Sequence, residues 1–147
     1  MNKQILIVLV SVTTLGGCSG TVPTLGVNNG ALLSCPKSPN CVNSQADDKE
    51  HFIEPLRYTG TREDARNRLV QIIKSEKRAK ILIVQDNYVL AEFTSALFRF
   101  VDDVEFYFPE KQADEAVVHV RSASRIGYSD LGVNRKRIEQ IRSQFND

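Results

Sequence analysis

Carboxylates and a histidine that could perform acid–base chemistry lie in the second half of the chain. Residues 100–108 read FVDDVEFYF and place Asp103 and Glu105 two positions apart. In a strand, such residues share one face with their Cα atoms about 7 Å apart, and paired carboxylates can act as acid and base. His119 alternates onto the same face of a later strand. Asp103, Glu105 and His119 are therefore the candidates for a hydrolase-type catalytic site.

The arginine-rich stretch at residues 120–142, VRSASRIGYSDLGVNRKRIEQIR, offers a different chemistry. Its arginines could hold a carboxylate or phosphate through bidentate hydrogen bonds. A structural interpretation competes with this one. Asp102 falls among phenylalanines, where an unpaired carboxylate is costly, so we expect it and Asp103 to be coupled to the arginines of residues 121–125. The basic start of the last helix at residues 135–137 also needs compensation, which Asp102, Asp103 or Asp130 could supply in a buried Arg–Asp network that ties this helix to the sheet. The candidates for ligand binding are Arg121, Arg125, Arg135, Asp102, Asp103 and Asn134.

Two cysteines bracket the short stretch CPKSPNC, Cys35 to Cys41. In an oxidising compartment we expect them to form a disulfide, which stabilises such a small loop by about 2 kcal/mol. Zinc binding with His51 and His119 would depart from the usual ligand spacing of about two to four residues. A redox site would need C-x-x-C, which is absent. We therefore expect neither a metal nor a cofactor.

The N-terminus predicts a route to the cell envelope. A basic start, an apolar run over residues 5–12 and small residues before Cys18 are typical of a signal peptide, residues 1–17. The run is shorter than the roughly 20 residues that span a bilayer. The junction LGGC resembles the lipobox of bacterial lipoproteins, which implies acylation of Cys18, with palmitate among its chains. Ser19 resembles the sorting signal for the outer membrane, facing the periplasm. An ordinary signal peptide with an incidental cysteine is the alternative.

Composition limits the remaining possibilities. A formal net charge of +1 over 147 residues argues against a nucleic-acid partner, which would favour a basic excess. Residues 18–33 contain few bulky side chains and predict a flexible tether. Residues 34–147 suit a single domain with one core. The expected partners are the membrane, through the lipid anchor, and a small anionic ligand or an envelope protein.

Periodic apolar residues predict the elements that position these side chains. Thr61 is a good N-cap for a helix over residues 62–77, and Asp86-Asn87 forms the turn of a hairpin. Strands are expected at residues 81–84, 88–95, 100–108 and 116–123, before a last helix that carries Asn134, Ile138, Ile141 and Phe145 on one side. This order predicts an α+β domain of two layers, a four-stranded antiparallel meander with both helices packed on one face.

Alternation along the strands separates the two faces of this sheet. The residues expected to meet the helices are Val89, Ala91, Phe93, Phe98, Phe100, Val104, Phe106, Phe108, Ala116, Val118 and Val120. The opposite face is expected to carry Glu92, Thr94, Arg99, Asp103, Glu105, Tyr107, His119 and Arg121. Such a charged face can be a ligand site, or a solvated face decorated with cross-strand ion pairs.

Three motifs together resemble a known family. C-P-x-S-P-N-C-V-x-S, D-D-V-E and R-S-x-S-R-x-G-x-S-D-x-G-x-N-x-x-R span residues 35–137 and are similar to an uncharacterised bacterial and plastid family, domain of unknown function 1499. The resemblance implies no reaction, cofactor or partner, but it implies that the motifs belong together. The positions it carries over are Cys35, Ser38, Asn40, Cys41, Asp102, Asp103, Arg121, Ser122, Ser124, Arg125, Gly127, Ser129, Asp130, Gly132, Asn134 and Arg137.

These observations favour a membrane-anchored envelope lipoprotein that acts as a binding or scaffold module, and no enzyme activity is assigned. The alternative is a hydrolase-type enzyme with a carboxylate and His119 on the polar face. A cluster of Arg121, Arg125 and carboxylates around an open pocket would favour binding. A hydrogen bond from His119 to a carboxylate in a cleft would favour catalysis. Full burial of every charge in the motifs would favour a scaffold.

Overall fold

The computed structural model describes residues 24–110 and 116–146. The expected signal peptide, Cys18 and the first part of the expected tether lie outside these ranges. The elements follow in the order β1 (Cys41–Asn43), β2 (Leu56–Arg57), α1 (Arg62–Ser75), β3 (Ala79–Val84), β4 (Tyr88–Thr94), β5 (Val101–Tyr107), β6 (Val117–Ser124) and α2 (Val133–Asn146). No helix in the described ranges combines the length and apolar character needed to cross a membrane.

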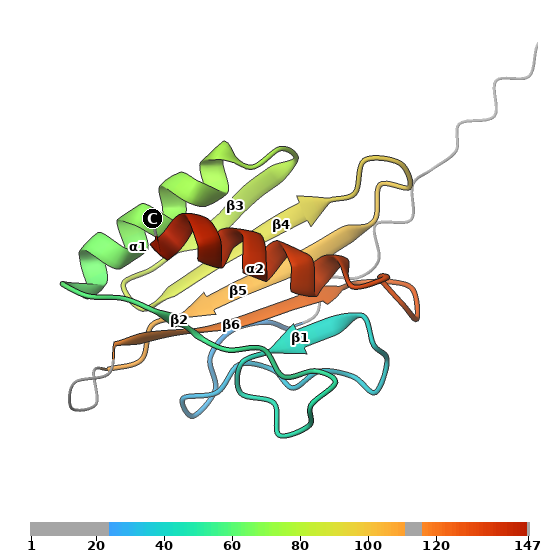
Figure 1. Cartoon of the computed structure of the whole chain (residues 1–147), viewed down its shortest axis with the longest axis horizontal. Coiled ribbons are helices and arrows are strands. Elements are labelled where there is room, and N and C mark those ends of the chain that lie inside the picture. Colours follow the sequence, from blue (N-terminus) through green and yellow to red (C-terminus); the bar gives the residue numbers. More distant parts are fainter. Residues whose placement is uncertain (1–23, 111–115, 147) are drawn as a thin grey trace, which may run out of the picture.

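The strands form one antiparallel sheet in the order β1-β6-β5-β4-β3, and β2 pairs with β6 beside this path (Figure 1). The predicted α+β class is correct, and β3 to β6 follow one another as a meander. The prediction of four strands is wrong, because β1 and β2 extend the sheet to six. With three and two residues, these strands are too short for alternation to reveal them.

Helix α1 shows why its sequence folds locally. Thr61 has extended backbone angles, and its side-chain oxygen accepts a hydrogen bond of 3.0 Å from the amide of Asp64. This bond satisfies an amide that has no partner within the helix. The helix ends at Ser75, two residues before the predicted end, because Glu76 is extended and Arg78 has a φ of 60°. The chain then enters β3.

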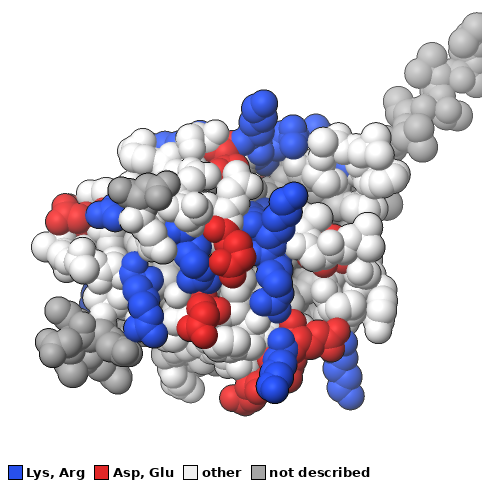
Figure 2. Space-filling view, viewed as in Figure 1, with Lys and Arg blue, Asp and Glu red and all other residues white. Residues whose placement is uncertain are grey.

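Both helices cover the same face of the sheet, and the main core lies between the two layers (Figure 1). Ala65, Leu69, Ile72 and Ile73 of α1 are buried there, together with Ile138, Ile141 and Phe145 of α2. The sheet contributes Val89, Ala91, Phe93, Val104, Phe106, Phe108, Val118 and Val120. Each fully buried side chain of this size contributes about 1.5–3 kcal/mol. On the outer surface of this side, basic and acidic side chains are interspersed (Figure 2).

Phe98 and Phe100 do not belong to the core, contrary to prediction. They are 69% and 43% exposed and stack on each other with ring centroids 5.5 Å apart. Strand β4 ends at Thr94, and a hydrogen bond of 2.8 Å from the Ser95 amide to the Phe100 carbonyl closes a turn. Arg99 has a φ of 58° within this turn, so strand alternation does not apply and Arg99 is not part of the polar sheet face.

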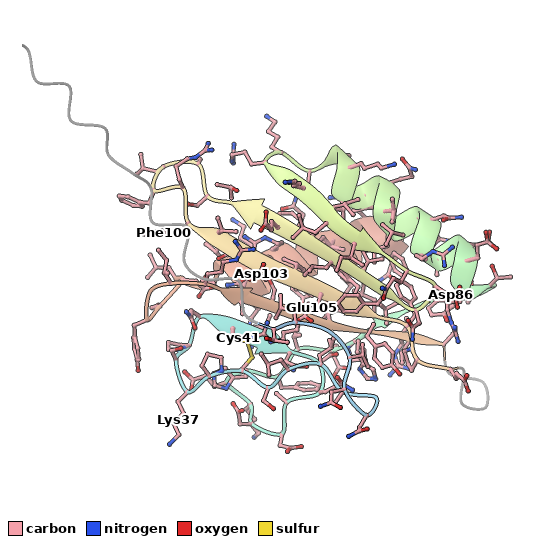
Figure 3. The ribbon with its side chains drawn as sticks, turned by 180° about the vertical axis from the view of Figure 1, so that it is seen from behind. Lys37, Cys41, Asp86, Phe100, Asp103 and Glu105 are labelled. Carbon is pink, nitrogen blue, oxygen red and sulfur yellow. A yellow bond between two sulfur atoms is a disulfide. The ribbon has the colours of Figure 1, made fainter. Side chains whose placement is uncertain are left out.

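The second face of the sheet is partly covered by the N-terminal segment. Leu32 packs with Tyr88 and Leu90, and the partly buried Leu25 and Val27 pack against this cluster. Residues 24–33 of the stretch that we predicted to be a flexible tether are therefore packed against the domain. Figure 3 shows the molecule from behind, where this segment crosses the sheet near Glu105.

Candidate functional site

Strands β5 and β6 place charged side chains on both faces of the sheet. In their register Asp103 lies opposite Ala123 and Glu105 opposite Arg121, while Asp102 lies opposite Ser124. Because successive residues point to opposite faces, Asp102 points towards the helices. Asp103 and Glu105 point to the other face. The motif charges therefore divide into two separate groups.

The helix-side network, formed by Asp102, Ser122, Asn134 and Arg137, joins α2 to the sheet. Arg137 donates from Nη2 to Asp102 Oδ2 over 2.6 Å and from Nη1 to Asn134 Oδ1 over 2.7 Å. Its guanidinium also lies 4.8 Å from the centroid of the Phe93 ring. Ser122 Oγ donates to Asn134 Oδ1 over 2.5 Å. This is a buried Arg–Asp network of the kind expected for the last helix.

Of the two expected sources of a partner for Asp102, the structure has the start of the last helix and not the segment of residues 121–125. Asp102 bonds Arg137 of α2, whereas Arg121 and Arg125 bond carboxylates on the other face of the sheet. Only Asp103 is coupled to the segment of residues 121–125. The expected coupling of Asp102 to that segment is wrong, because a single step along a strand reverses the direction of the side chain.

On the other face, Arg125 and Asp103 form a bidentate pair. Arg125 Nε donates to Asp103 Oδ2 over 2.9 Å, and Nη2 donates to Oδ1 over 2.7 Å. The same Nη2 bonds Glu92 Oε1. The hydrogen bonds to Asp103 raise the pKa of Arg125 above its ordinary value, so the guanidinium stays charged. Its side chain is only 5% exposed.

Glu105 gathers three donors beside this pair. Arg121 Nη1 lies 3.2 Å from Oε2, while Tyr88 Oη and the Gly26 amide donate to Oε1 over 2.7 and 3.0 Å. Burial, followed by the bond to Glu105, raises the pKa of Tyr88, so its phenol remains a donor. Arg121 is 5% exposed on its side chain, and its buried Nε has no hydrogen-bond partner among the described residues. A buried donor left unpaired is costly, so this Nε is the unsatisfied group of the site.

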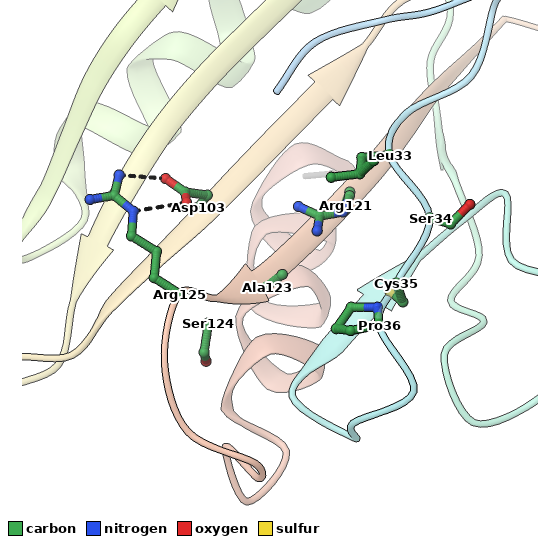
Figure 4. Close-up of a pocket in the computed structure, with 9 residues that line it drawn as sticks. All are labelled: Leu33, Ser34, Cys35, Pro36, Asp103, Arg121, Ala123, Ser124 and Arg125. Atoms are coloured by element: carbon green, nitrogen blue, oxygen red, sulfur yellow. Dashed lines mark hydrogen bonds and ion pairs between the residues drawn. The ribbon is translucent and has the colours of Figure 1, made fainter. Parts of the chain in front are cut away.

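Three of these charged residues, Asp103, Arg121 and Arg125, line a pocket of about 430 Å³ (Figure 4). One wall is the loop closed by the Cys35–Cys41 disulfide, here called the stapled loop, with the residues before it. The other wall is the face of β5 and β6. Cys35 and Cys41 form the expected disulfide, with Cα atoms 5.7 Å apart. The Arg121 guanidinium lies between β6 and the segment that carries Leu33 (Figure 4). The lining residues are Leu33, Ser34, Cys35, Pro36, Asp103, Arg121, Ala123, Ser124 and Arg125.

Among the described residues, His119 has no carboxylate partner. Its Nδ1 lies 3.1 Å from Ser44 Oγ, and its ring stacks on Tyr107 with centroids 6.2 Å apart. The Val120 amide donates to the same Ser44 oxygen over 2.9 Å, which leaves the hydroxyl proton available for Nδ1. Burial lowers the pKa of His119 and favours the neutral ring. The arrangement that would have favoured a hydrolase is therefore not formed by these contacts.

Two further candidates lie outside the pocket. Arg135 donates from Nη1 to the Phe52 carbonyl and from Nη2 to the Glu50 carbonyl, each over 2.8 Å, so the expected three-arginine anion site is reduced to Arg121 and Arg125. Asn134 belongs to the helix-side network. Within the described ranges, no group of three or more histidine, cysteine, aspartate or glutamate side chains could hold a metal ion.

Sequence reasoning did not identify every residue that forms the site. Tyr88 was missed, although it alternates with Leu90 and Glu92 on β4 and so belongs to the polar face. Leu33, Ser34 and Pro36 were also missed as pocket walls. No local signal marks these residues, because their position depends on the N-terminal segment folding back over the sheet.

The fold and the site define a two-layer α+β domain with a disulfide-stapled loop that closes a charged pocket on the sheet face away from the helices. Residues 31–145 match the model of the family described as Protein of unknown function (DUF1499), and the chain belongs to this family. The family resemblance carried by the three motifs is thus confirmed. No curated protein matches the chain.

Proposed function

We propose that the protein is a lipid-anchored binding module of the bacterial cell envelope, whose pocket takes a small ligand bearing one carboxylate or a similar acceptor oxygen. The observation that carries this proposal is Arg121. Its guanidinium is buried, Nη1 is bound to Glu105, the residue lines the pocket, and Nε is buried without a partner among the described residues. A ligand oxygen that reached Nε through a local shift of the pocket wall would remove the cost of this unpaired donor.

The charges around the pocket favour a ligand with little net charge. Arg121 and Arg125 provide two positive charges, whereas Glu92, Asp103 and Glu105 provide three negative ones. A phosphate ester with two negative charges would meet this excess of carboxylates. A single carboxylate bound at Arg121 would meet less repulsion, in keeping with the falling Coulomb energy of a smaller charge.

The pocket walls suggest the rest of the ligand. Leu33, Pro36 and Ala123 supply apolar surface on both sides of the charged floor. Small-molecule sites commonly combine such apolar walls with a few polar groups that fix orientation. A compact ligand with an apolar body and one carboxylate end therefore fits the chemistry of the lining. The hydrolase alternative has less support, because His119 is bonded to Ser44 and not to a carboxylate.

Anchoring is supported by the sequence LGGC that ends at Cys18. Attachment of more than one acyl chain is needed for stable anchoring, and a triacylated cysteine would meet this condition. The Cys35–Cys41 disulfide fits an oxidising compartment such as the periplasm. Metabolic labelling with a fatty-acid probe should mark the wild-type protein and not Cys18→Ala. Equal labelling of the two would contradict acylation at Cys18.

A thermal-shift screen tests the ligand class. We expect small monocarboxylates with apolar bodies to raise the melting temperature of the purified protein, because a ligand that binds only the folded state stabilises it. Matched phosphate esters and the corresponding neutral amides should have weaker effects. Ala123→Leu fills the pocket without removing a charge and should abolish the shift. Arg135→Gln, outside the pocket, should keep it.

Three outcomes of this thermal-shift screen would contradict the proposed ligand site or ligand class. Equal shifts in wild type and Ala123→Leu would show that carboxylates bind elsewhere. Absence of a shift for every monocarboxylate, in a protein whose melting is cooperative, would contradict the ligand class. Larger shifts with phosphate esters than with carboxylates would contradict the charge argument for the pocket.

A further inference from the structure

The most exposed large apolar side chains of the described chain gather at one end of the sheet. Leu97 is 79%, Tyr128 75% and Leu131 94% exposed. They belong to two loops, residues 95–100 between β4 and β5 and residues 125–132 between β6 and α2. A hydrogen bond of 3.0 Å from the Arg125 amide to the Val101 carbonyl joins the bases of these loops. Figure 1 shows both loops at the same end of the molecule.

The loop of residues 95–100 holds its aromatic side chains in a defined arrangement. Phe98 and Phe100 stack with an interplanar angle of 24°, and the turn is closed by bonds from the Ser95 amide to the Phe100 carbonyl and from the Phe100 amide to Ser95 Oγ. The rings are therefore presented outward by a hydrogen-bonded turn. Exposed aromatic and aliphatic side chains clustered in this way commonly mark a contact with a partner or a membrane.

Basic side chains flank this apolar end. Lys77, Arg78 and Lys136 line a hollow of about 330 Å³ together with Ala96 and Val133. Arg78 is fixed beside the loop, because its carbonyl accepts a hydrogen bond of 3.0 Å from the Thr94 amide. The acidic residue of this hollow, Glu76, accepts hydrogen bonds from Gln140 and Gln144. The lysines and Arg78 are thus placed to meet negative charge from outside the molecule.

The opposite end of the sheet has a different character. Its β3–β4 turn carries Asp86, which bonds Arg62 and Arg66 of α1. Glu63 and Asp64 lie in the first turn of the same helix. One end of the domain is therefore apolar and basic, while the other carries ion-paired carboxylates. Apolar side chains beside lysine and arginine are the composition that binds the interface of an anionic membrane.

We propose that the docking end, formed by loops 95–100 and 125–132 with Lys77, Arg78 and Lys136, inserts into the headgroup region of an anionic phospholipid bilayer. This inference rests on the proposed lipid anchor at Cys18. Gly26 is bound to Glu105 in the middle of the sheet, and the eight Cα-to-Cα steps from position 18 to position 26 span at most about 28 Å. Val101, the first residue of β5 after loop 95–100, lies about 13 Å along the strand from Glu105, so the docking end is within reach of the anchored membrane.

Tryptophan fluorescence can test the insertion at a single site, because the chain contains no tryptophan. Phe98→Trp places the reporter in the docking end, and Asn67→Trp places it on the exposed side of α1 as a matched control. Both full-length lipidated proteins are reconstituted in vesicles of phosphatidylethanolamine and phosphatidylglycerol. We expect a blue-shifted emission for Phe98→Trp that brominated lipids quench and aqueous iodide does not. Asn67→Trp should show the reverse.

The outcomes separate the anchor from the docking end. A protein that does not float with the vesicles would overturn the anchor, and this inference with it. A protein that floats while Trp emission at position 98 matches the control in wavelength and iodide quenching would overturn the inference alone and leave this end to a protein partner. In the Phe98→Trp background, Lys77→Glu with Lys136→Glu should weaken quenching by brominated lipids. Unchanged quenching would contradict the role of the basic side chains.

Discussion

The two faces of strands β5 and β6 both bury ionised side chains, yet they satisfy them differently. On the helix side, Arg137 bonds Asp102 and Asn134, and Asn134 also donates to the Asn40 carbonyl over 3.1 Å. On the other side, Arg121 lines a pocket and bonds Glu105, but its buried Nε has no partner in the described part of the chain. Among the described residues, every buried side-chain nitrogen and oxygen of the first group has a partner, whereas the second group leaves Arg121 Nε without one.

The sequence motifs contain residues with two different roles, a structural one and a place in the pocket, and the two faces of the sheet separate them. Asp102 and Asp103 are neighbours in the chain, and yet one ties a helix to the sheet and the other lines the pocket. A buried ion pair with all its hydrogen bonds made has a structural explanation that is complete in itself. An arginine that lines a pocket and has a buried donor with no partner among residues 24–110 and 116–146 lacks such an explanation, and this is why the binding proposal rests on Arg121.

The largest effect is expected from breaking the helix-side network. Asp102→Asn should lower the free energy of unfolding by about 3–5 kcal/mol, because it leaves Arg137 buried without its counter-ion. A double-mutant cycle with Arg137→Gln, measured by urea unfolding, should give a coupling above about 1 kcal/mol. The cycle of Asp102→Asn with Arg125→Gln is the control and should be close to additive. Strong coupling in the control cycle would contradict the separation of the two faces.

Removal of the staple should have a smaller effect and should act on the pocket side. Replacing Cys35 and Cys41 together by serine should lower stability by about 2 kcal/mol, since the cross-link constrains only a short loop in the unfolded chain. The same change should also weaken carboxylate binding, because Cys35 is part of the pocket wall. Unfolding curves and ligand titrations of the double variant measure the two effects. Full ligand affinity in the double variant would show that the pocket does not need the staple.

A smaller change on the pocket side of the sheet tests how the hydrogen bond from Tyr88 stabilises Glu105. Tyr88→Phe removes the donor at 2.7 Å from the carboxylate and should lower stability by about 1.5 kcal/mol. The loss stays moderate because Arg121 and the Gly26 amide continue to bond Glu105. Tyr107→Phe, which keeps the aromatic ring on the neighbouring strand, is the matched control. A loss of stability as large as that of Asp102→Asn would mean that contacts on the pocket side stabilise the fold as much as those on the helix side.

The two histidines should produce the smallest effects, with opposite signs. The hydrogen bond to Asp48 raises the pKa of His51 above 6.5, so its contribution to stability is complete below that pH and is lost as pH rises through the raised pKa. His51→Asn should therefore lose more stability at about pH 6 than at about pH 8.5. Burial lowers the pKa of His119, so the wild-type ring favours the folded state less as pH falls below 6.5. His119→Asn should accordingly cost less at the acidic pH.

Thermal unfolding across this pH range measures both histidine variants. The Asp48 pKa is lowered, first by the hydrogen bond from the backbone of His51, so its part of the interaction is present above 3.8 and is lost as pH falls through the lowered value. The pair therefore contributes most between these two limits. Parallel pH profiles for wild type and His51→Asn would contradict the contribution of the Asp48–His51 pair.

Local signals predicted the elements that form from local interactions. The N-cap at Thr61 and the apolar spacing of Leu69, Ile72 and Ile73 fixed helix α1, and the turn at residues 86–87 fixed the β3–β4 hairpin. Alternation failed at Phe98, because it was extended through a turn in which residues no longer point to alternate faces. Strands β1 and β2 carry too few residues to give a periodic signal.

The sequence predicted which charged residues form the site, but it did not predict how they pair. The cost of burying Asp102 indicated that a cation must meet it, and both the segment of residues 121–125 and the start of the last helix could supply one. Its partner is Arg137, which lies 35 residues further along the chain on α2. The choice among arginines depended on which layer each one occupies. The pocket wall at Leu33 and Pro36 depended on the N-terminal segment covering the sheet, which side-chain spacing within that segment does not reveal.

Unbiased mass spectrometry of small molecules released from the purified protein tests the central claim most directly. Wild type is compared with Ala123→Leu, which fills the pocket, and with Ala46→Leu, which adds the same bulk at a partly exposed position outside it. The account predicts one class of small carboxylate released by wild type and Ala46→Leu and absent from Ala123→Leu. The same molecules released in equal amounts by all three proteins would contradict a ligand site at Arg121.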